Sequence, residues 1–263
     1  MSELYNFNLC NLPEREIKPR NIGITMVMDK GISLRQAQDF VDTSSDFVDF
    51  VKLGFGTSLI SKNVKEKIKL YQKANLKVYV GGTLFEAFVI RNKFEDYIKY
   101  ISDLGIDSAE VSDGSIEIDH EKKCEYIFKL SKEFMVLSEV GSKEEGVIIH
   151  PSRWIKMMEN ELKAGAFKVI AEARESGNVG IYHKNGTAHT LLINRIVNKI
   201  KIENIIWETP QKSQQVYFLK LFGSNVNVGN ISIDDVIPLE TLRLGLRGDT
   251  FFTFLPESIN KPI

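Results

Sequence analysis

Short apolar runs alternate with longer amphipathic stretches along nearly the whole chain, and this alternation restricts the fold more than any other feature. Most of the runs are rich in Val, Ile and Phe and end near Gly, Asp, Pro or Asn, which is typical of strands. The runs cover residues 22–28, 47–53, 77–80, 108–111, 134–140, 167–172, 204–208 and 225–228. Strands that alternate with helices indicate an α/β fold with a parallel sheet.

The stretches between the runs have the periodicity of amphipathic helices, and several end in Gly, a common helix stop. Examples are residues 62–74, 84–104, 121–133, 152–164, 187–199 and 212–222. Eight strands at regular spacing, each followed by a helix, predict a (β/α)8 TIM barrel. An open doubly wound sheet is the alternative, because periodicity alone does not exclude it, but the spacing and the length favour the barrel. Without a linker or a shift in composition, residues 1–263 are expected to form a single domain.

Composition and charge exclude several classes of protein. The 34 basic and 35 acidic side chains nearly balance, which argues against a nucleic-acid or anionic-membrane partner. No apolar run approaches the roughly 20 residues that cross a bilayer. The N-terminus lacks the pattern of a signal peptide, so we expect a soluble, cytoplasmic protein. Cys10 and Cys124 are too few and too far apart for a disulfide framework or a zinc site.

Charged or amide residues follow or end nearly every predicted strand. The segment VIAEARESG, for example, begins as a buried strand and ends with Glu172 and Arg174 before a Gly-containing loop. A single such charge is usually solvated or part of a structural ion pair. In a barrel, however, the carboxyl ends of all strands meet on one face, where the chemistry is placed. Their coincidence at nearly every strand end therefore predicts an active site on that face.

Three of these strand-end residues are carboxylates on consecutive strands, Glu139, Glu172 and Glu208. Carboxylates that approach one another are unfavourable unless a cation lies between them. Magnesium prefers oxygen ligands and suits this set better than zinc. The four histidines show no metal-ligand spacing, so a zinc or histidine-centred hydrolase is not expected. The sequence thus predicts Mg²⁺ on these three glutamates, although any of them could instead orient a lysine or an arginine.

Cationic side chains are also expected near this rim, and they predict an anionic substrate with more than one charged group. The cations are Arg20, Lys52, Lys143, Arg174, Lys212 and Arg247. Asn227 adds an amide from the last strand. Backbone amides at Gly82 and Thr83 or at Gln211 could bind phosphate, but ordinary helix starts look the same.

Taken together, these segments resemble the phosphosulfolactate synthase family. The matching motifs, in family order, are KPR at 18–20, VKLGFGT at 51–57, GGT at 81–83, EVSDG at 110–114, EVGSK at 139–143, ARESG at 173–177, ETPQKSQQ at 208–215 and LETLRLGLRGDTF at 239–251. The resemblance covers about residues 18–252, and the last two motifs are not generic phosphate loops.

The resemblance implies a magnesium-dependent (β/α)8 barrel that adds sulfite to phosphoenolpyruvate, giving (2R)-phospho-3-sulfolactate through a metal-stabilised enolate. In methanogens this reaction opens coenzyme M biosynthesis, but members occur in other bacteria too, and plant relatives are associated with heat-stress tolerance. Lys143 resembles the lysine proposed as general acid, although it could instead clamp phosphate or sulfite. A homo-oligomer is compatible with this interpretation, and the sequence does not reveal the oligomeric state.

Two alternatives stay open from the residues alone. One is another magnesium-dependent lyase or aldolase that acts on a phosphorylated carboxylate or keto acid. The other is a stress-associated barrel that acts by binding a partner protein. The intact charged rim favours an enzyme over the second alternative.

Overall fold

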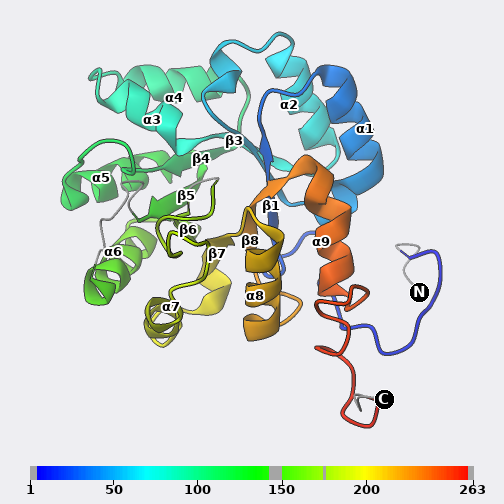
Figure 1. Ribbon diagram of the computed structural model, residues 1–263. Helices are drawn as coiled ribbons and strands as arrows, with labels where there is room; N and C mark the ends of the chain where they lie inside the picture. The colour runs from blue at the N-terminus through cyan, green and yellow to red at the C-terminus, as the bar shows by residue number, and fades with distance from the viewer. Residues whose placement is uncertain (1–4, 142–149, 174–175, 260–263) are drawn as a thin grey trace.

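Eight parallel strands form one sheet that curls into a nearly closed barrel, with the helices on its outside (Figure 1). The structure is a computed structural model that describes residues 5–141, 150–173 and 176–259. The strands are β1 Thr25–Asp29, β2 Phe50–Leu53, β3 Lys77–Val80, β4 Ser108–Val111, β5 Met135–Val140, β6 Lys168–Ala171, β7 Ile205–Glu208 and β8 Val228–Ser232. The strand order is β3-β2-β1-β8-β7-β6-β5-β4, and the two edge strands, β3 and β4, contact each other. The prediction of a (β/α)8 barrel is confirmed.

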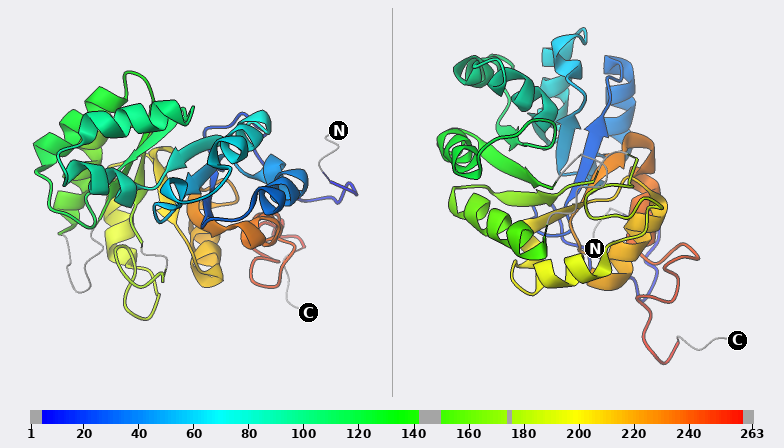
Figure 2. Two further views of the ribbon diagram at one scale, coloured as in Figure 1. Left: turned by 90° about the horizontal axis from the view of Figure 1, so that it is seen from above. Right: turned by 60° about the vertical axis from the view of Figure 1, so that its left-hand side comes forward.

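Helices follow the strands and surround the sheet, as the two views of Figure 2 also show. The α-helices are α1 Leu34–Ser44, α2 Val64–Lys73, α3 Gly82–Val89, α4 Phe94–Asp103, α5 His120–Leu130, α6 Pro151–Lys163, α7 Thr190–Val197, α8 Lys212–Phe222 and α9 Val236–Arg243. Short 3₁₀ helices lie at η1 Ser45–Phe47, η2 Thr57–Leu59, η3 Ile202–Asn204 and η4 Ile233–Asp235. Within the described ranges, no helix combines the length and the apolar character that crossing a membrane requires.

The single helix predicted over residues 84–104 is in fact two helices, α3 and α4. Asn92 lies between them in the left-handed conformation, with φ of 56°, which a continuing helix does not allow. The second helix then begins with Glu95 and Asp96 in its first turn, where the helix dipole stabilises acidic side chains. The apolar periodicity continues across the break, so it does not reveal the interruption.

Strand β8 starts three residues later than the predicted run over residues 225–228. Asn227 precedes it, and its side-chain carbonyl accepts a hydrogen bond from the Ile24 amide at 3.1 Å. The strand instead includes Gly229, where a Cβ atom would lie 2.5 Å from the Met26 side chain in the neighbouring strand. Close packing, rather than strand propensity, therefore explains the glycine in β8.

The hydrophobic core has two parts, the barrel interior and the layer between strands and helices. Phe50 of β2 lies 6.4 Å, between ring centroids, from Tyr79 of β3 and from Phe167, which immediately precedes β6. Since β2 and β6 lie on different sides of the barrel, these rings meet in its interior. On the outside, Trp207 of β7 stacks on Phe218 of α8 at 4.8 Å. Burying one such ring stabilises the fold by roughly 1.5–3 kcal/mol.

Arg243 connects the end of α9 to the amino-terminal end of the barrel. Its guanidinium is fully buried and donates to the carbonyls of Ser224 at 2.6 Å, Val226 at 2.8 Å and Ile24 at 3.1 Å. These carbonyls precede β8 and β1, so one side chain joins the last helix to both strands. A buried guanidinium is well suited to this role because its five N–H donors lie in a fixed plane.

We expect Arg243→Leu to lower the free energy of unfolding by about 3–5 kcal/mol, because it removes three buried hydrogen bonds and leaves the Val226 carbonyl without its donor. Urea denaturation followed by circular dichroism measures the effect. Arg195→Leu on the exposed face of α7 is the matched control and should leave the unfolding midpoint nearly unchanged. An equal shift in both variants would show that the buried hydrogen bonds of Arg243 contribute little.

Candidate active site

A cavity of about 360 Å³ opens at the carboxyl-terminal ends of the strands. Seven of the eight strands or the loops that follow them contribute to it, from β1 to β3 and from β5 to β8. Its lining residues are Met28, Lys52, Gly54, Phe55, Gly81, Gly82, Thr83, Glu139, Glu172, Ala173, Ser176, Glu208 and Asn230. The prediction that strand ends converge on one face is confirmed for Lys52 and for the three glutamates.

Glu139, Glu172 and Glu208 form a compact group of carboxylates in this cavity. One oxygen from each lies within 4.8 Å of the others, and none of the three residues is more than 3% exposed. Gly141, just after β5, allows Glu172 to approach, because a Cβ atom there would lie 2.3 Å from that of Glu172. Its φ of 148° also favours glycine. The local backbone is therefore shaped around the carboxylate group.

Lys52 lies among carboxylates near the centre of the barrel. Its Nζ atom is 3.1 Å from Glu110, 3.4 Å from Glu139 and 3.7 Å from Glu208. Burial alone lowers the pKa of Lys52, but the three carboxylates raise it well above its ordinary value. Lys52 is therefore a permanent ammonium and not a base or a Schiff-base nucleophile near neutral pH.

Glu110 is a fourth fully buried carboxylate at this end of the barrel, supplied by β4. It accepts a hydrogen bond from the Gly82 amide at 2.5 Å, and so links β4 to the start of α3. This amide, considered above as a phosphate donor, is therefore already bound. Glu110 lies inside an apolar run, and a charge at a buried strand position was the signal that could have identified it.

The pKa of Glu208 reflects its surroundings. Burial raises it to about 8, and the neighbouring carboxylates of Glu139 and Glu110 act in the same direction. Lys52 and the Ala173 amide, which donates to Glu208 at 2.7 Å, oppose that shift. The other oxygen of Glu208 accepts no hydrogen bond from the described residues. Glu208 is thus protonated below about pH 8 unless a further cation joins the site.

Tyr79 lies beside this group and was not recognised from the sequence. It pairs with Lys52 across the β2–β3 ladder, and its buried hydroxyl has no hydrogen-bond partner among the described residues. Burial and the Glu110 carboxylate raise its pKa well above the ordinary value, so it is a neutral phenol that can donate.

Among the described residues, Lys52 is the ammonium that contacts these carboxylates, and even with Glu208 protonated the three other carboxylates outnumber it. A divalent cation would neutralise that excess, and carboxylate oxygens are the ligands that Mg²⁺ prefers. One oxygen of Glu208 accepts no hydrogen bond from the described residues, and this oxygen and the short separations within the carboxylate group fit such an ion. The residues present are therefore compatible with magnesium held by Glu139, Glu172 and Glu208.

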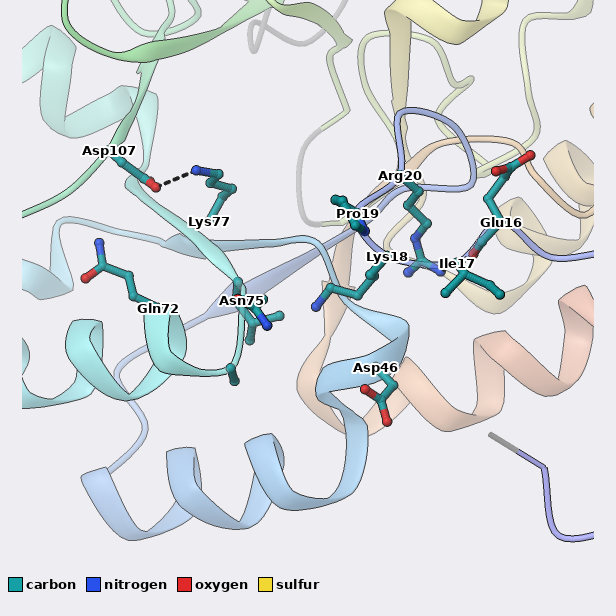
Figure 3. Close-up of a pocket in the computed structure, with 12 residues that line it drawn as sticks. Glu16, Ile17, Lys18, Pro19, Arg20, Asp46, Gln72, Asn75, Lys77 and Asp107 are labelled. Carbon is teal, nitrogen blue, oxygen red and sulfur yellow. Dashed lines mark hydrogen bonds and ion pairs between the residues drawn. The ribbon is translucent and has the colours of Figure 1, made fainter. Parts of the chain in front are cut away.

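Two predicted site residues lie at the opposite end of the barrel. Arg20 pairs with Asp49 at 3.0 Å, and Asp49 also accepts from the amide of Thr25, the first residue of β1. Figure 3 shows Arg20 among the residues that line a separate pocket, and none of the three clustered glutamates lines that pocket. Asn227 binds the Ile24 amide and the carbonyl of Ile205, at the starts of β1 and β7. Neither Arg20 nor Asn227 lines the cavity, and the proposed site does not include them.

The remaining predicted cations are not among the described residues that line the cavity. Lys212 begins α8 and pairs with Asp249 at 2.6 Å, with half of its side chain exposed. Arg247 is half-buried in the turn after α9. Lys143 and Arg174 fall outside the described residues. From β8 the cavity receives Asn230, which has a φ of 56° and whose amide nitrogen donates to the Ala173 carbonyl at 3.3 Å.

Residues 13–249 match the family described as (2R)-phospho-3-sulfolactate synthase (ComA). A phosphosulfolactate synthase of Methanothermobacter thermautotrophicus is 44% identical over 244 residues, which cover 90% of this chain and 95% of the relative. One of Bacillus subtilis is 41% identical over 244 residues, covering 92% and 97%. Protein HEAT-STRESS-ASSOCIATED 32 of Arabidopsis thaliana is 23% identical over 261 residues, covering 88% of each chain.

Solved structures of other enzymes share the fold at low sequence identity. The YdjI aldolase of Escherichia coli superimposes with a TM-score of 0.55 at 11% identity, covering 81% of this chain and 76% of the aldolase. The 3-hexulose-6-phosphate synthase of Salmonella typhimurium gives a TM-score of 0.54 at 14% identity, covering 84% and 99%. At such identities the likeness shows the fold alone.

The raised pKa of Glu208 predicts how stability depends on pH when no metal is bound. In the unfolded chain a glutamate loses its proton near pH 4.5, whereas Glu208 retains it in the folded state up to about pH 8. Stability should therefore fall as pH rises from about 5 to 8. Glu208→Gln does not titrate and, in EDTA at pH 8.5, should exceed the parent by about 2–4 kcal/mol in urea denaturation.

Glu203→Gln, near the amino-terminal end of β7, is the matched control and should leave the pH dependence of the parent unchanged. If the parent and Glu208→Gln lose stability equally between pH 5 and 8, Glu208 is already ionised in the folded protein.

Proposed function

The chain belongs to the (2R)-phospho-3-sulfolactate synthase family, and we propose that it catalyses the addition of sulfite to phosphoenolpyruvate to give (2R)-phospho-3-sulfolactate. The observation that carries this proposal is the family match over residues 13–249, with synthases more than 40% identical over about nine-tenths of the chain. The cavity supports the proposal because it combines an ammonium, Lys52, which can attract an anionic substrate, with the carboxylates of Glu139, Glu172 and Glu208, which can bind a cation.

Both substrates are anions, so their binding needs fixed positive charge in the cavity. Lys52 supplies such a charge, because its carboxylate partners keep it protonated. Arg174, Lys212 and Arg247 are proposed to supplement it by binding phosphate or sulfite as substrate reaches the rim. A guanidinium does not release its proton in proteins, so the arginines bind and orient the substrate but do not donate to carbon.

We propose that Glu139, Glu172 and Glu208 hold magnesium, either directly or through water. Bound there, the ion would act as a Lewis acid that stabilises negative charge on the substrate carboxylate. Binding would also release the proton of Glu208, because the nearby cation favours the ionised carboxylate.

The reaction forms one carbon–sulfur bond and one carbon–hydrogen bond. The sulfur lone pair of sulfite attacks C3 of phosphoenolpyruvate, and the π electrons between C2 and C3 move toward the carboxylate. A proton then adds to C2. Lys143 is proposed to donate it, since it follows β5 four residues after Glu139 in the sequence, and an ammonium can act as a general acid.

A cytoplasmic location and a homo-oligomeric state are proposed as well and stay predictions. The downstream product, including any role in coenzyme M biosynthesis, depends on the other enzymes of the cell rather than on this site.

We expect the purified protein to form phosphosulfolactate only when phosphoenolpyruvate, sulfite and magnesium are all present. Each substrate is varied separately, and the product is identified by mass spectrometry. Replacing Glu139, Glu172 or Glu208 by Gln should raise the magnesium concentration needed for half-maximal rate by about 10-fold or more, because each loses a charged ligand.

Glu203→Gln serves as the control and should keep the magnesium requirement of the parent. Absence of product with magnesium supplied would refute the proposed reaction. Product formation with an unchanged magnesium requirement in all three variants would instead place the ion elsewhere on the rim.

Substitutions of Lys143 separate proton donation from anion binding. Lys143→Ala should lower the rate at saturating substrate by roughly 100- to 10,000-fold if a general acid is lost. Lys143→Arg keeps the charge but removes a usable acid, so its turnover should fall almost as far. Steady-state kinetics with both substrates saturating measures this. Turnover near that of the parent in Lys143→Arg would make Lys143 an anion clamp and require another proton donor.

A further inference from the structure

Lys123, on the buried face of α5, lies outside the cavity but contacts the backbone of the carboxylate group. Its side chain is fully buried, and Nζ donates to the main-chain carbonyl of Glu139 at 2.6 Å. The same ammonium pairs with Asp113, after β4, at 2.8 Å and with Glu161 of α6 at 3.0 Å. One buried cation thus joins the β4 loop, strand β5 and two helices.

The position of this contact along β5 is informative. The hydrogen-bonded ladder between β4 and β5 ends at the pair Val111 and Ser138, one residue before Glu139. Lys123 therefore supplies a donor to the Glu139 carbonyl where neighbouring β4 has ended. Ser138 is held as well, because its hydroxyl donates to Glu161 at 2.6 Å. Ser138 and Glu139, at this end of β5, are thus each held by a side chain from a helix on the outside of the barrel.

We propose that Lys123 is a positioning residue that sets the orientation of the Glu139 carboxylate, an inference that rests on the proposed magnesium site. The carbonyl and the side chain of Glu139 share one Cα atom, so fixing the carbonyl also fixes the direction in which the side chain leaves the strand. Partners that orient a metal ligand without touching the metal commonly change its affinity when they are replaced.

Helices α5 and α6 provide the rigid support that this role needs. They pack side by side against β4, β5 and β6, as Figure 1 shows. The charges are balanced locally, since Lys123 faces Glu161, which is fully buried, and Asp113, which is mostly buried. Burial alone lowers the pKa of Lys123, but the two carboxylates raise it above its ordinary value, so the donor is always protonated.

Titration with Mn²⁺, which also prefers oxygen ligands, tests the role without relying on activity. In Lys123→Met we expect the dissociation constant for Mn²⁺, read from the electron paramagnetic resonance signal of the free ion, to rise about 10- to 100-fold. Lys168→Met is the matched control, because Lys168 is also buried and donates to a carbonyl, that of Glu203, at 2.7 Å. It lies at the start of β6, at the opposite end of the barrel, and should bind Mn²⁺ within about 2-fold of the parent.

The double variant Lys123→Met/Glu161→Gln shows whether weaker Mn²⁺ binding comes from a less stable fold or from a misplaced Glu139 carboxylate. The second change removes the fully buried one of the two charges that Lys123→Met leaves unpaired, and it keeps an acceptor for Ser138; Asp113 is partly exposed to solvent. This variant should therefore regain most of the stability lost in Lys123→Met while still binding Mn²⁺ weakly. Affinity equal to the parent in either Lys123 variant overturns the positioning role and leaves the proposed function intact. Failure of the parent itself to bind Mn²⁺ refutes the metal site and this inference with it.

Discussion

One ammonium among four buried carboxylates is the interaction on which the rest of this barrel depends. Lys52 contacts three of the four, and Glu172 completes the set. Transferring an unpaired carboxylate from water to a protein interior costs several kcal/mol, and the ion pairs with Lys52 offset part of that cost for Glu110, Glu139 and Glu208. The raised pKa of Glu208 follows mainly from its burial, and the nearby carboxylates of Glu139 and Glu110 add to the shift.

Further buried charges hold the loops and strands around this centre. At the end of β1, Asp29 accepts from the Gly31 amide at 2.7 Å and pairs with Lys67 of α2 at the same distance. Arg243 has the corresponding role at the amino-terminal end, where it binds three carbonyls. Buried charged side chains such as these favour a single arrangement of the surrounding backbone, because moving one partner away would leave a buried charge unpaired. A rigid scaffold of this type suits a site whose ligands come from separate strands.

The fold by itself does not determine the chemistry. An aldolase and a hexulose-phosphate synthase share this barrel at 11% and 14% identity. Function in such barrels depends on the residues at the carboxyl ends of the strands, which vary while the core keeps its shape. Membership of the phosphosulfolactate synthase family rests instead on sequence identity along nearly the whole chain.

The sequence by itself determined the barrel, because eight apolar runs separated by helical stretches leave few other arrangements, and it placed Glu139, Glu172 and Glu208 together, since parallel strands end on one face. Only the tertiary structure separated two nearby asparagines, placing Asn227 at the opposite end and Asn230 in the cavity. A shift of three residues along β8 decides which end of the barrel an amide reaches, and local pattern does not specify that register. The sequence likewise does not distinguish Lys123 from the other lysines of α5. Its role arises because packing buries it against the end of β5, a contact between segments 16 residues apart that no local signal encodes.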